Sequence, residues 1–469
     1  MASLKTTTIS TLALAISALI SGCYNQDNDY AITHVSVIPM TENTILENQT
    51  VLIRDGEIVH IGPANKTPVP ATLETIDGTG RYLMPGLADM HTHLLCGSED
   101  ESCYLGKKEA EIYLAHGVTT VLNLQDTSGT DKNLIKTQMI EPIAAGELVG
   151  PHIYTASFAG GPGDLPNAIQ PNQIVVTEQE GRDHVINSKT QGYDFIKVYD
   201  GVSAAAFHGI VDQARQEGMA VIGHFTQADP AQSLINGMDM VAHASAFFDH
   251  YFSHNPTPEL INEAIGLSRA NGVYINTTLT LPKKAADMAC ANEQAFQDLL
   301  NQTQTRYANP IELGLWRTFL YIISDFPGCA PFILENKHAA IQGYTKGFYD
   351  AGVKLVLGTD SPLVWGVPGY SAYEELGAIS AIGLSPYQTL EIATRNAGEF
   401  IAEHIPSAQG FGTIEVGKRA DLLLLENNPL TDLSHIQSQV GVMANGRWYS
   451  AEELETRLNN IATDYANMR

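Results

Sequence analysis

The pattern of apolar and polar residues changes character twice along this chain of 469 residues. Residues 30–86 alternate polar and apolar in short runs, with Asp55-Gly56 as a hairpin signal, and they predict a small β-sheet region. From residue 87 onward, short apolar runs alternate with longer helical stretches, which indicates parallel strands joined by helices. Short apolar runs return at residues 422–425 and 440–444.

Eight of the apolar runs are predicted to be strands of one barrel. They cover residues 87–94, 118–124, 152–157, 195–200, 220–225, 240–244, 273–279 and 354–359. Eight strands with intervening helices predict an α/β fold, a (β/α)8 TIM barrel, over residues 87–404. Residues 281–337 form an insertion of helical character, which is either a lid or a structural cap. The last helical stretch of the barrel lies around residues 386–404.

The strands at the two ends of the chain are expected to combine. Residues 31–86 plus 405–448 would form one composite β-sandwich domain, and residues 449–469 a C-terminal helix. The composition fits a large folded enzyme, because 44% of the residues are hydrophobic and 17% are charged.

Six polar residues close strands of the predicted barrel. His91 and His93 end the first strand, and two residues that are two positions apart on a strand point to the same face. Each of the other four residues also has an ordinary structural interpretation, such as a hydrogen-bonded core histidine or an aspartate that caps a helix. Because the C-terminal ends of barrel strands meet at one mouth, we expect all six to face one another. They are His91, His93, Lys197, His224, His243 and Asp360.

This order of residues resembles the amidohydrolase superfamily, in its prolidase-like and imidazolonepropionase-like branch. The resemblance also includes the flanks of these residues, at positions 84–93, 194–197 and 358–361, and the tail at 412–422. It implies a metal-dependent hydrolase that cleaves carbon–nitrogen bonds of amides, cyclic amides or peptides.

The resemblance also implies a site with two divalent ions, zinc by preference, although the ligands do not exclude manganese, iron or cobalt. His91 and His93 would hold one ion with Asp360, and His224 and His243 the other. Lys197, converted to a carbamate, would bridge the two ions. Asp360 would also take the proton of the attacking water and pass it to the leaving nitrogen.

The run Ala-Gly-Gly-Pro-Gly-Asp at residues 159–164 departs from the prolidase-like pattern. Pro162 stands where those relatives commonly carry a histidine that helps to hold the substrate carboxylate, and proline offers neither a side-chain donor nor a backbone N–H. Tyr199, on the strand face of Lys197, is a candidate substrate contact, and barrel packing is its alternative role. The sequence therefore does not decide whether the substrate is a cyclic amide or a dipeptide.

A non-catalytic lipoprotein that binds a ligand on the same scaffold is an alternative of another class. The presence of both Lys197 and Asp360 favours catalysis. The formal net charge of −26 argues against nucleic acid as a partner, since phosphates require a basic surface. We expect a small-molecule substrate, and the sequence leaves open whether the chain forms a homo-oligomer.

Residues 1–22 are predicted to be a signal peptide of the lipoprotein type. Their apolar stretch is too short to span a bilayer comfortably, and it ends in Leu-Ile-Ser-Gly-Cys, which resembles a lipoprotein processing site. Cys23 would carry the lipid, and residues 23–30 would be a tether. An ordinary signal peptide with an incidental cysteine is the alternative. Because Tyr24 replaces aspartate, we expect the outer membrane of a Gram-negative bacterium, on the side that faces the periplasm.

Four cysteines remain after Cys23, and export permits disulfides among them. Four cysteines allow three pairings, and four reduced thiols are the alternative. Position along the chain favours local pairing, Cys96 with Cys103 and Cys290 with Cys329.

Replacing Cys23 by serine should abolish lipid labelling and membrane association while the folded domain stays active, because a peripheral anchor of this kind needs its acyl chains. Labelling with a radioactive fatty acid and fractionation of the cells measure the two effects. Lipid incorporation into the Cys23→Ser variant would contradict the lipoprotein interpretation.

Overall fold

The computed structural model describes residues 29–96, 102–124, 132–164, 174–289, 293–324, 331–363 and 365–469. The predicted signal peptide, Cys23 and the proposed Cys290–Cys329 pair lie outside the described residues. Within the described part, no helix combines the length and the apolar character needed to cross a membrane.

Eight parallel strands form the centre of the molecule, and the predicted TIM barrel is confirmed. They follow one another around the sheet in chain order, from β6 to β13. Their bounds are β6 (Leu87–Thr92), β7 (Val118–Asn123), β8 (His152–Ala159), β9 (Phe195–Val198), β10 (Ala220–Gly223), β11 (Met240–Val241), β12 (Tyr274–Asn276) and β13 (Leu355–Val356).

Several strands are shorter than the sequence predicts. The runs predicted at residues 240–244 and 354–359 pair only over Met240–Val241 and Leu355–Val356. In both cases the chain leaves the extended conformation a few residues later, at His243 with φ 71° and at Asp360 with φ 59°. Such positive values are uncommon for residues other than glycine and often mark functional positions.

The barrel closes through backbone hydrogen bonds between β6 and the chain that follows β13. Met90 N donates to Leu357 O at 2.8 Å, Asp360 N donates to His91 O at 2.9 Å, and His93 N donates to Ser361 O at 2.9 Å. These bonds place the end of the first strand beside the end of the last.

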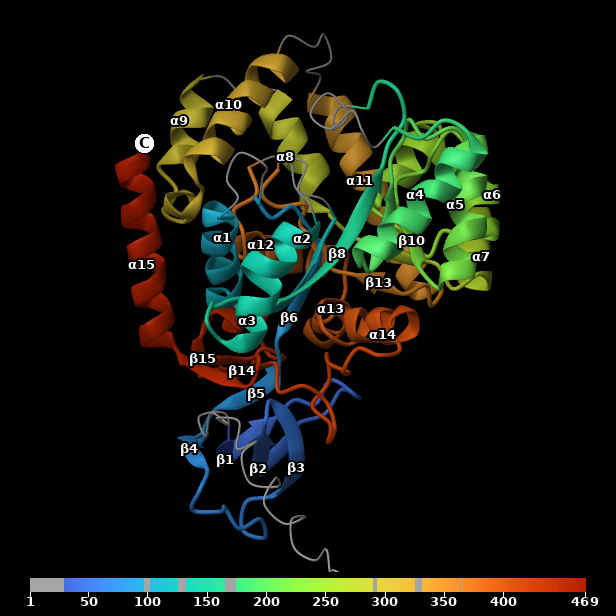
Figure 1. The fold of residues 1–469 in the computed structure, drawn as a ribbon. Coiled ribbons are helices and arrows are strands. Elements are labelled where there is room, and N and C mark those ends of the chain that lie inside the picture. Colours follow the sequence, from blue (N-terminus) through green and yellow to red (C-terminus); the bar gives the residue numbers. More distant parts are fainter. Residues whose placement is uncertain are drawn as a thin grey trace, which may run out of the picture.

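Helices surround the barrel, as Figure 1 shows. Their starts follow local capping rules: Thr177 and Glu180 form a capping box at α4, and Ser203 caps α5. The helical stretch predicted at residues 386–404 is two helices, because Thr394 breaks it with φ −135° and ψ −81°. The helices are α1 (Tyr104–Ala115), α2 (Lys132–Ile135), the π-helix η2 (Lys136–Ile140), α3 (Glu141–Ala145), α4 (Glu178–Gln191), α5 (Ala204–Glu217), α6 (Pro230–Asn236), the π-helix η5 (Phe247–Tyr251), α7 (Pro258–Ala270), α12 (Tyr370–Ala381), α13 (Pro386–Ala393) and α14 (Arg395–His404).

The insertion adds a helical layer over the C-terminal end of the barrel (Figure 1). Its buried side chains, Trp316 and Leu320 among them, share one apolar cluster with Ile461 and Tyr465 of the C-terminal helix. The layer consists of α8 (Thr280–Ala289), α9 (Glu293–Leu300), the 3-10 helix η6 (Thr303–Tyr307), α10 (Pro310–Ser324) and α11 (Pro331–Asp350), and the C-terminal helix is α15 (Ala451–Met468).

Cys96 and Cys103 form a disulfide, which joins the chain after β6 to the start of α1. This local pairing is the one that the sequence favours.

A second, mixed sheet lies at the opposite end of the barrel, built from both ends of the chain (Figure 1). Its strand order is β16-β15-β14-β5-β1-β2-β3, and β4 pairs with β1. The two ends meet where β14 runs antiparallel to β5, with Leu422 opposite Pro85. The strands are β1 (Tyr30–Val37), β2 (Leu46–Arg54), β3 (Glu57–Pro63), β4 (Glu74–Asp77), β5 (Tyr82–Pro85), β14 (Leu422–Leu425), β15 (Gln439–Ala444) and β16 (Arg447–Ser450), and the 3-10 helix η7 (Leu433–Gln437) lies between β14 and β15.

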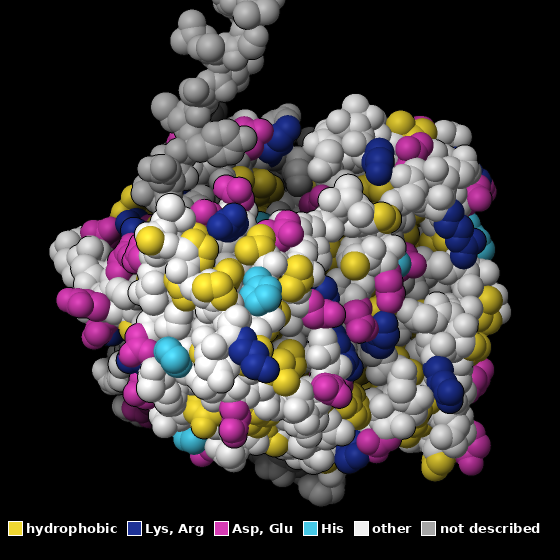
Figure 2. Space-filling view, turned by 90° about the horizontal axis from the view of Figure 1, so that it is seen from below, with side chains coloured by type: hydrophobic (Ala, Val, Ile, Leu, Met, Phe, Trp, Pro, Cys, Tyr) yellow, Lys and Arg dark blue, Asp and Glu magenta, His cyan; other side chains and the backbone are white. Residues whose placement is uncertain are grey.

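Acidic and basic side chains are interspersed on the face seen in Figure 2. On this face the negative net charge is therefore spread over the surface, as is usual for a solvated exterior.

A buried ion pair fastens the second sheet to the barrel. Arg419 and Asp421 are 6% and 3% exposed, and Arg419 Nη2 lies 2.7 Å from Asp421 Oδ2. The same nitrogen donates to Thr120 Oγ1 of β7 at 2.8 Å. The guanidinium therefore connects the chain just before β14 to a barrel strand.

Replacing Arg419 by alanine should lower the free energy of unfolding by about 3 to 5 kcal/mol, because it leaves the Asp421 carboxylate buried without its partner. Denaturant unfolding followed by circular dichroism measures the loss. Lys418→Ala is the matched control, since its partly exposed pair with Glu415 should contribute less than about 1 kcal/mol. Equal losses in both variants would show that the buried pair has no special role.

Candidate metal centre

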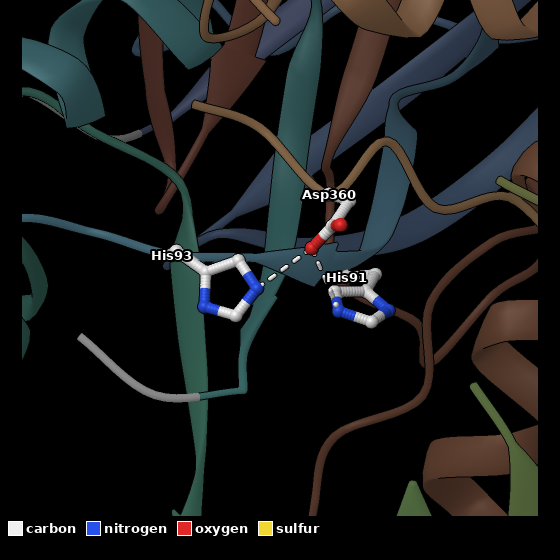
Figure 3. A group of neighbouring side chains, drawn as sticks. All are labelled: His91, His93 and Asp360. Atoms are coloured by element: carbon white, nitrogen blue, oxygen red, sulfur yellow. Dashed lines mark hydrogen bonds and ion pairs between the residues drawn. The ribbon is translucent and has the colours of Figure 1, made fainter. Parts of the chain in front are cut away.

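Three of the predicted ligands form a compact cluster at the point where the barrel closes (Figure 3). Asp360 Oδ1 lies 2.8 Å from His93 Nε2 and 3.1 Å from His91 Nε2. One ligand atom from each residue lies within 4.8 Å of the others, so the three residues could hold a metal ion. The cluster joins residues that are 267 positions apart in the chain.

A buried aspartate, Asp89, fixes how β6 and the end of β13 meet. Its carboxylate accepts from Thr359 Oγ1 at 2.6 Å, from Thr359 N at 3.0 Å and from His91 N at 3.2 Å. Burial raises the pKa of Asp89 to about 7, although these hydrogen bonds oppose the shift. Asp89 thus holds the backbone beside both His91 and Asp360.

The other two histidines lie against this cluster. The ring of His243 is 4.5 Å from that of His91 and 4.9 Å from that of His224, measured between centroids. His224 Nδ1 lies 2.6 Å from Asp200 Oδ1, and His243 Nδ1 lies 3.0 Å from Thr278 Oγ1. With Nδ1 engaged in each ring, Nε2 is the nitrogen left for a ligand.

Lys197 is buried among these groups with 2% of its surface exposed. Burial lowers the pKa of its ammonium group to about 8, although the carboxylates of Asp360 and Asp200 raise it. Its charge in turn lowers the pKa of His91, His224 and His243, so the amine lies within electrostatic reach of all three. The six residues that the sequence singles out therefore converge on one place.

The charge state of the cluster suits a divalent cation. Burial lowers the pKa of His91 to about 3 and that of His243 well below its usual value, so both imidazoles are neutral with a free lone pair. Burial alone would raise the pKa of Asp360, but His91 and His93 outweigh it and hold that pKa well below the ordinary value.

The polar contacts of His91 also indicate that this residue is a metal ligand. Among the described residues, Nδ1 of this fully buried ring has no hydrogen-bond partner, and Nε2 has only the 3.1 Å contact with Asp360 Oδ1. A buried imidazole that is so poorly hydrogen-bonded is costly unless a ligand takes its lone pair. The donor set of neutral imidazoles and one carboxylate is the one that zinc and related ions prefer, so the residues fit a metal.

The run at residues 159–164 is a tight turn that packs on the chain after β9. Asp164 accepts from Gly161 N at 2.7 Å and from Gly201 N at 2.9 Å. A Cβ atom on Gly161 would lie 1.6 Å from Gly201 O, so only glycine fits there. Pro162 lies in this turn and brings no side-chain donor to the mouth.

Tyr199, His250 of η5 and His254 are the remaining candidates near the site. The ring of Tyr199 lies 4.1 Å from the ring of His224, so the tyrosine contacts a proposed ligand. His250 Nε2 is 3.8 Å from Asp200 Oδ2, whereas His254 is mostly exposed beside Asp249.

Sequence reasoning did not identify Asp89, Asp200 or Thr278, which orient the predicted ligands. Asp89 had a readable signal, because it lies two positions before His91 in an apolar run and therefore on the same strand face. Asp200 and Thr278 follow their strands in irregular chain, where no periodicity places a side chain.

A model of the Amidohydrolase family matches residues 82–449. The imidazolonepropionase of Brucella anthropi is 24% identical over 409 residues, which are 84% of this chain and 92% of that protein. Among solved structures, a bottromycin amidohydrolase aligns with a TM-score of 0.71 at 20% identity over 93% of this chain and 91% of its own. A Xaa-Pro dipeptidase with bound methionine aligns with a TM-score of 0.66 at 19% identity over 90% and 100%. The two solved structures show the same fold.

Proposed function

Since this chain belongs to the Amidohydrolase family and is a hydrolase that acts on carbon–nitrogen bonds, we propose that it works with two divalent metal ions, zinc by preference, on an amide-type substrate. The observation that carries the proposal is the convergence of neutral imidazoles, an ionised carboxylate and a buried lysine at one end of the barrel. Cyclic amides are the substrate class that we favour.

In this proposal His91, His93 and Asp360 hold one ion, and His224 and His243 hold the other through Nε2. When bound, the ions supply Lewis acidity, which makes water a nucleophile near neutral pH and polarises the substrate carbonyl. Asp200 and Thr278 keep the two outer imidazoles in the required tautomer through their contacts with Nδ1.

Lys197 supplies the anion that lies between the two halves of the site. Its lowered pKa leaves a larger share of the amine neutral, and only the neutral amine attacks carbon dioxide. The neutral amine forms one nitrogen–carbon bond with carbon dioxide and loses one proton. Counted from the ammonium form, two protons leave, so the cationic side chain becomes an anionic carbamate. That change supplies negative charge where four imidazoles and one carboxylate meet.

Asp360 moves the proton during hydrolysis. Its carboxylate is ionised because of the adjacent His91 and His93, so it can accept the proton of the attacking water. It then returns that proton to the leaving nitrogen as the carbon–nitrogen bond breaks. The products are a carboxylic acid and an amine, or one opened ring when the substrate is cyclic.

A metallo-dipeptidase remains the alternative within the same chemistry. A dipeptide brings a free carboxylate, and Pro162 offers it no donor at the turn after β8. This observation favours cyclic amides and other neutral substrates. Assaying the zinc-loaded protein on lactams, N-acyl amino acids, X-Pro dipeptides and aryl esters tests the choice. Turnover of X-Pro dipeptides alone would overturn it, and no turnover of any amide would overturn the proposed function.

Elemental analysis of the active protein should find about two divalent ions per chain.

Lys197→Ala should lose metal and activity together, because the anion between the ions is gone, and short carboxylic acids added to the buffer should restore part of both. Lys346→Ala, which removes a partly exposed amine that pairs with Asp350 on α11, is the control and should keep its metal. An active Lys197→Ala enzyme would show that the site is mononuclear or lies elsewhere.

Asp360→Asn should keep much of the metal and lower kcat by roughly 100-fold to 10,000-fold, which is the usual contribution of a positioned acid–base group. The amide retains the shape and one ligand oxygen but cannot accept a proton. Metal content and steady-state rates measured on the same preparation separate the two effects. Wild-type turnover by a fully metallated variant would leave Asp360 with a structural role alone.

A further inference from the structure

Helix α10 of the insertion is linked to both loops that leave the metal cluster, to one directly and to the other through Glu109 of α1. Trp316, which is 1% exposed, donates from Nε1 to Pro362 O at 2.7 Å. Asn309, just before the helix, donates from Nδ2 to Glu109 Oε1 at 3.0 Å, and Glu109 Oε2 accepts from Leu95 N at 2.8 Å. Pro362 and Leu95 each lie two residues beyond a member of the cluster, Asp360 and His93. The first half of α10 and the residue before it are therefore connected to both loops.

The second of these connections contains two buried carboxyl groups that both accept hydrogen bonds from Asn309. Glu109 of α1 and Glu312 of α10 are each 1% exposed, and they interact through their side chains. Glu312 Oε2 accepts from Asn309 N at 3.0 Å, whereas Glu312 Oε1 meets no donor among the described residues. Glu109 accepts at both oxygens, from Leu95 and Asn309. The free oxygen is thus on Glu312, where a proton would complete a hydrogen bond to Glu109.

The groups that face this pair do not neutralise two negative charges. Tyr113 of α1 and Tyr465 of α15 are neutral neighbours whose pKa values burial raises first, and the two carboxyl groups raise them further. Arg469 is the cation that acts on Glu312, but it donates to the carbonyls of Thr305 and Ala308 instead of to the carboxyl. Two ionised carboxylates cannot remain in contact in such a place, so the pair retains at least one proton.

We propose that this shared proton fastens helix α10 onto the loops that carry His93 and Asp360, so that the insertion is a proton-dependent clamp on the catalytic cluster. With the proton present, Glu312 donates to Glu109, and Glu109 keeps its hold on Leu95 N. Without it, two buried carboxylates repel each other, and α10 separates from α1 while the loop at Leu95 loosens. Glu109, Glu312 and Trp316 are then positioning residues, which act through the chain on either side of the cluster.

The direction of the pH effect follows from where the proton binds. Burial raises the pKa of Glu109 to about 7 and that of Glu312 well above its ordinary value, and in the opened state both would titrate as ordinary glutamates. The clamped state therefore binds more protons than the opened state. Relative to the opened state, the clamped state is most stable below the ordinary pKa of glutamate. This stability falls as the pH rises and stops falling once the pH passes the raised pKa of the clamped state.

Hydrogen–deuterium exchange at the Leu95 amide tests the clamp in the full-length holoprotein. Because opening releases one proton, the opening equilibrium of the wild type, corrected for intrinsic exchange, should rise about tenfold per pH unit from neutral pH upward. Glu312→Gln places a permanent N–H donor toward Glu109, so its opening equilibrium should not change from neutral pH upward. Release of zinc to a chelator should follow the same two profiles.

The matched control is Glu293→Gln on α9, an exposed position of the same insertion, and it should follow the wild type. If Glu312→Gln does not fold, the wild type alone still tests the clamp, because a Leu95 opening equilibrium that stays constant from neutral pH upward would contradict the proposal. Parallel profiles for wild type and Glu312→Gln would overturn the proposal. The zinc readout rests on the proposed function, whereas the Leu95 exchange does not, so a metal-free protein would still test the clamp.

Discussion

The closure of the barrel between β6 and the chain after β13 is the interaction on which the site depends. Its backbone hydrogen bonds bring His91 and His93 beside Asp360 across most of the sequence. The register matters as much as the contact, because a slip of one residue would turn both histidines away from the mouth. Asp89 sets that register by accepting from the backbone and the hydroxyl of Thr359.

The site also concentrates ionisable groups that burial destabilises. His91 and His243 remain neutral, and Asp360 remains charged beside the imidazoles. The pKa of Lys197 is lowered. None of these states is favourable for stability alone. Together they provide free lone pairs, one carboxylate and one reactive amine, so the same desolvation that destabilises the fold prepares the chemistry.

Two supports outside the barrel keep this arrangement in place. At one end, Arg419 joins Asp421 to Thr120 and ties the second sheet to a barrel strand. At the other end, α10 reaches Pro362 directly and Leu95 through Glu109. The first support is an ion pair with its charges matched, whereas the second contains two acids and therefore depends on a proton.

The sequence by itself determined the class of fold and predicted the six residues that we propose as ligands, because strand periodicity and the ends of apolar runs are local signals. It also indicated the local disulfide, since Cys96 and Cys103 flank one loop. Only the tertiary structure decided which side chains orient those six. Asp200 meets His224, Thr278 meets His243, and Glu312 meets Glu109 across separate elements. Such partners have no period or spacing in the chain, because their positions depend on how helices and loops pack around the closed barrel.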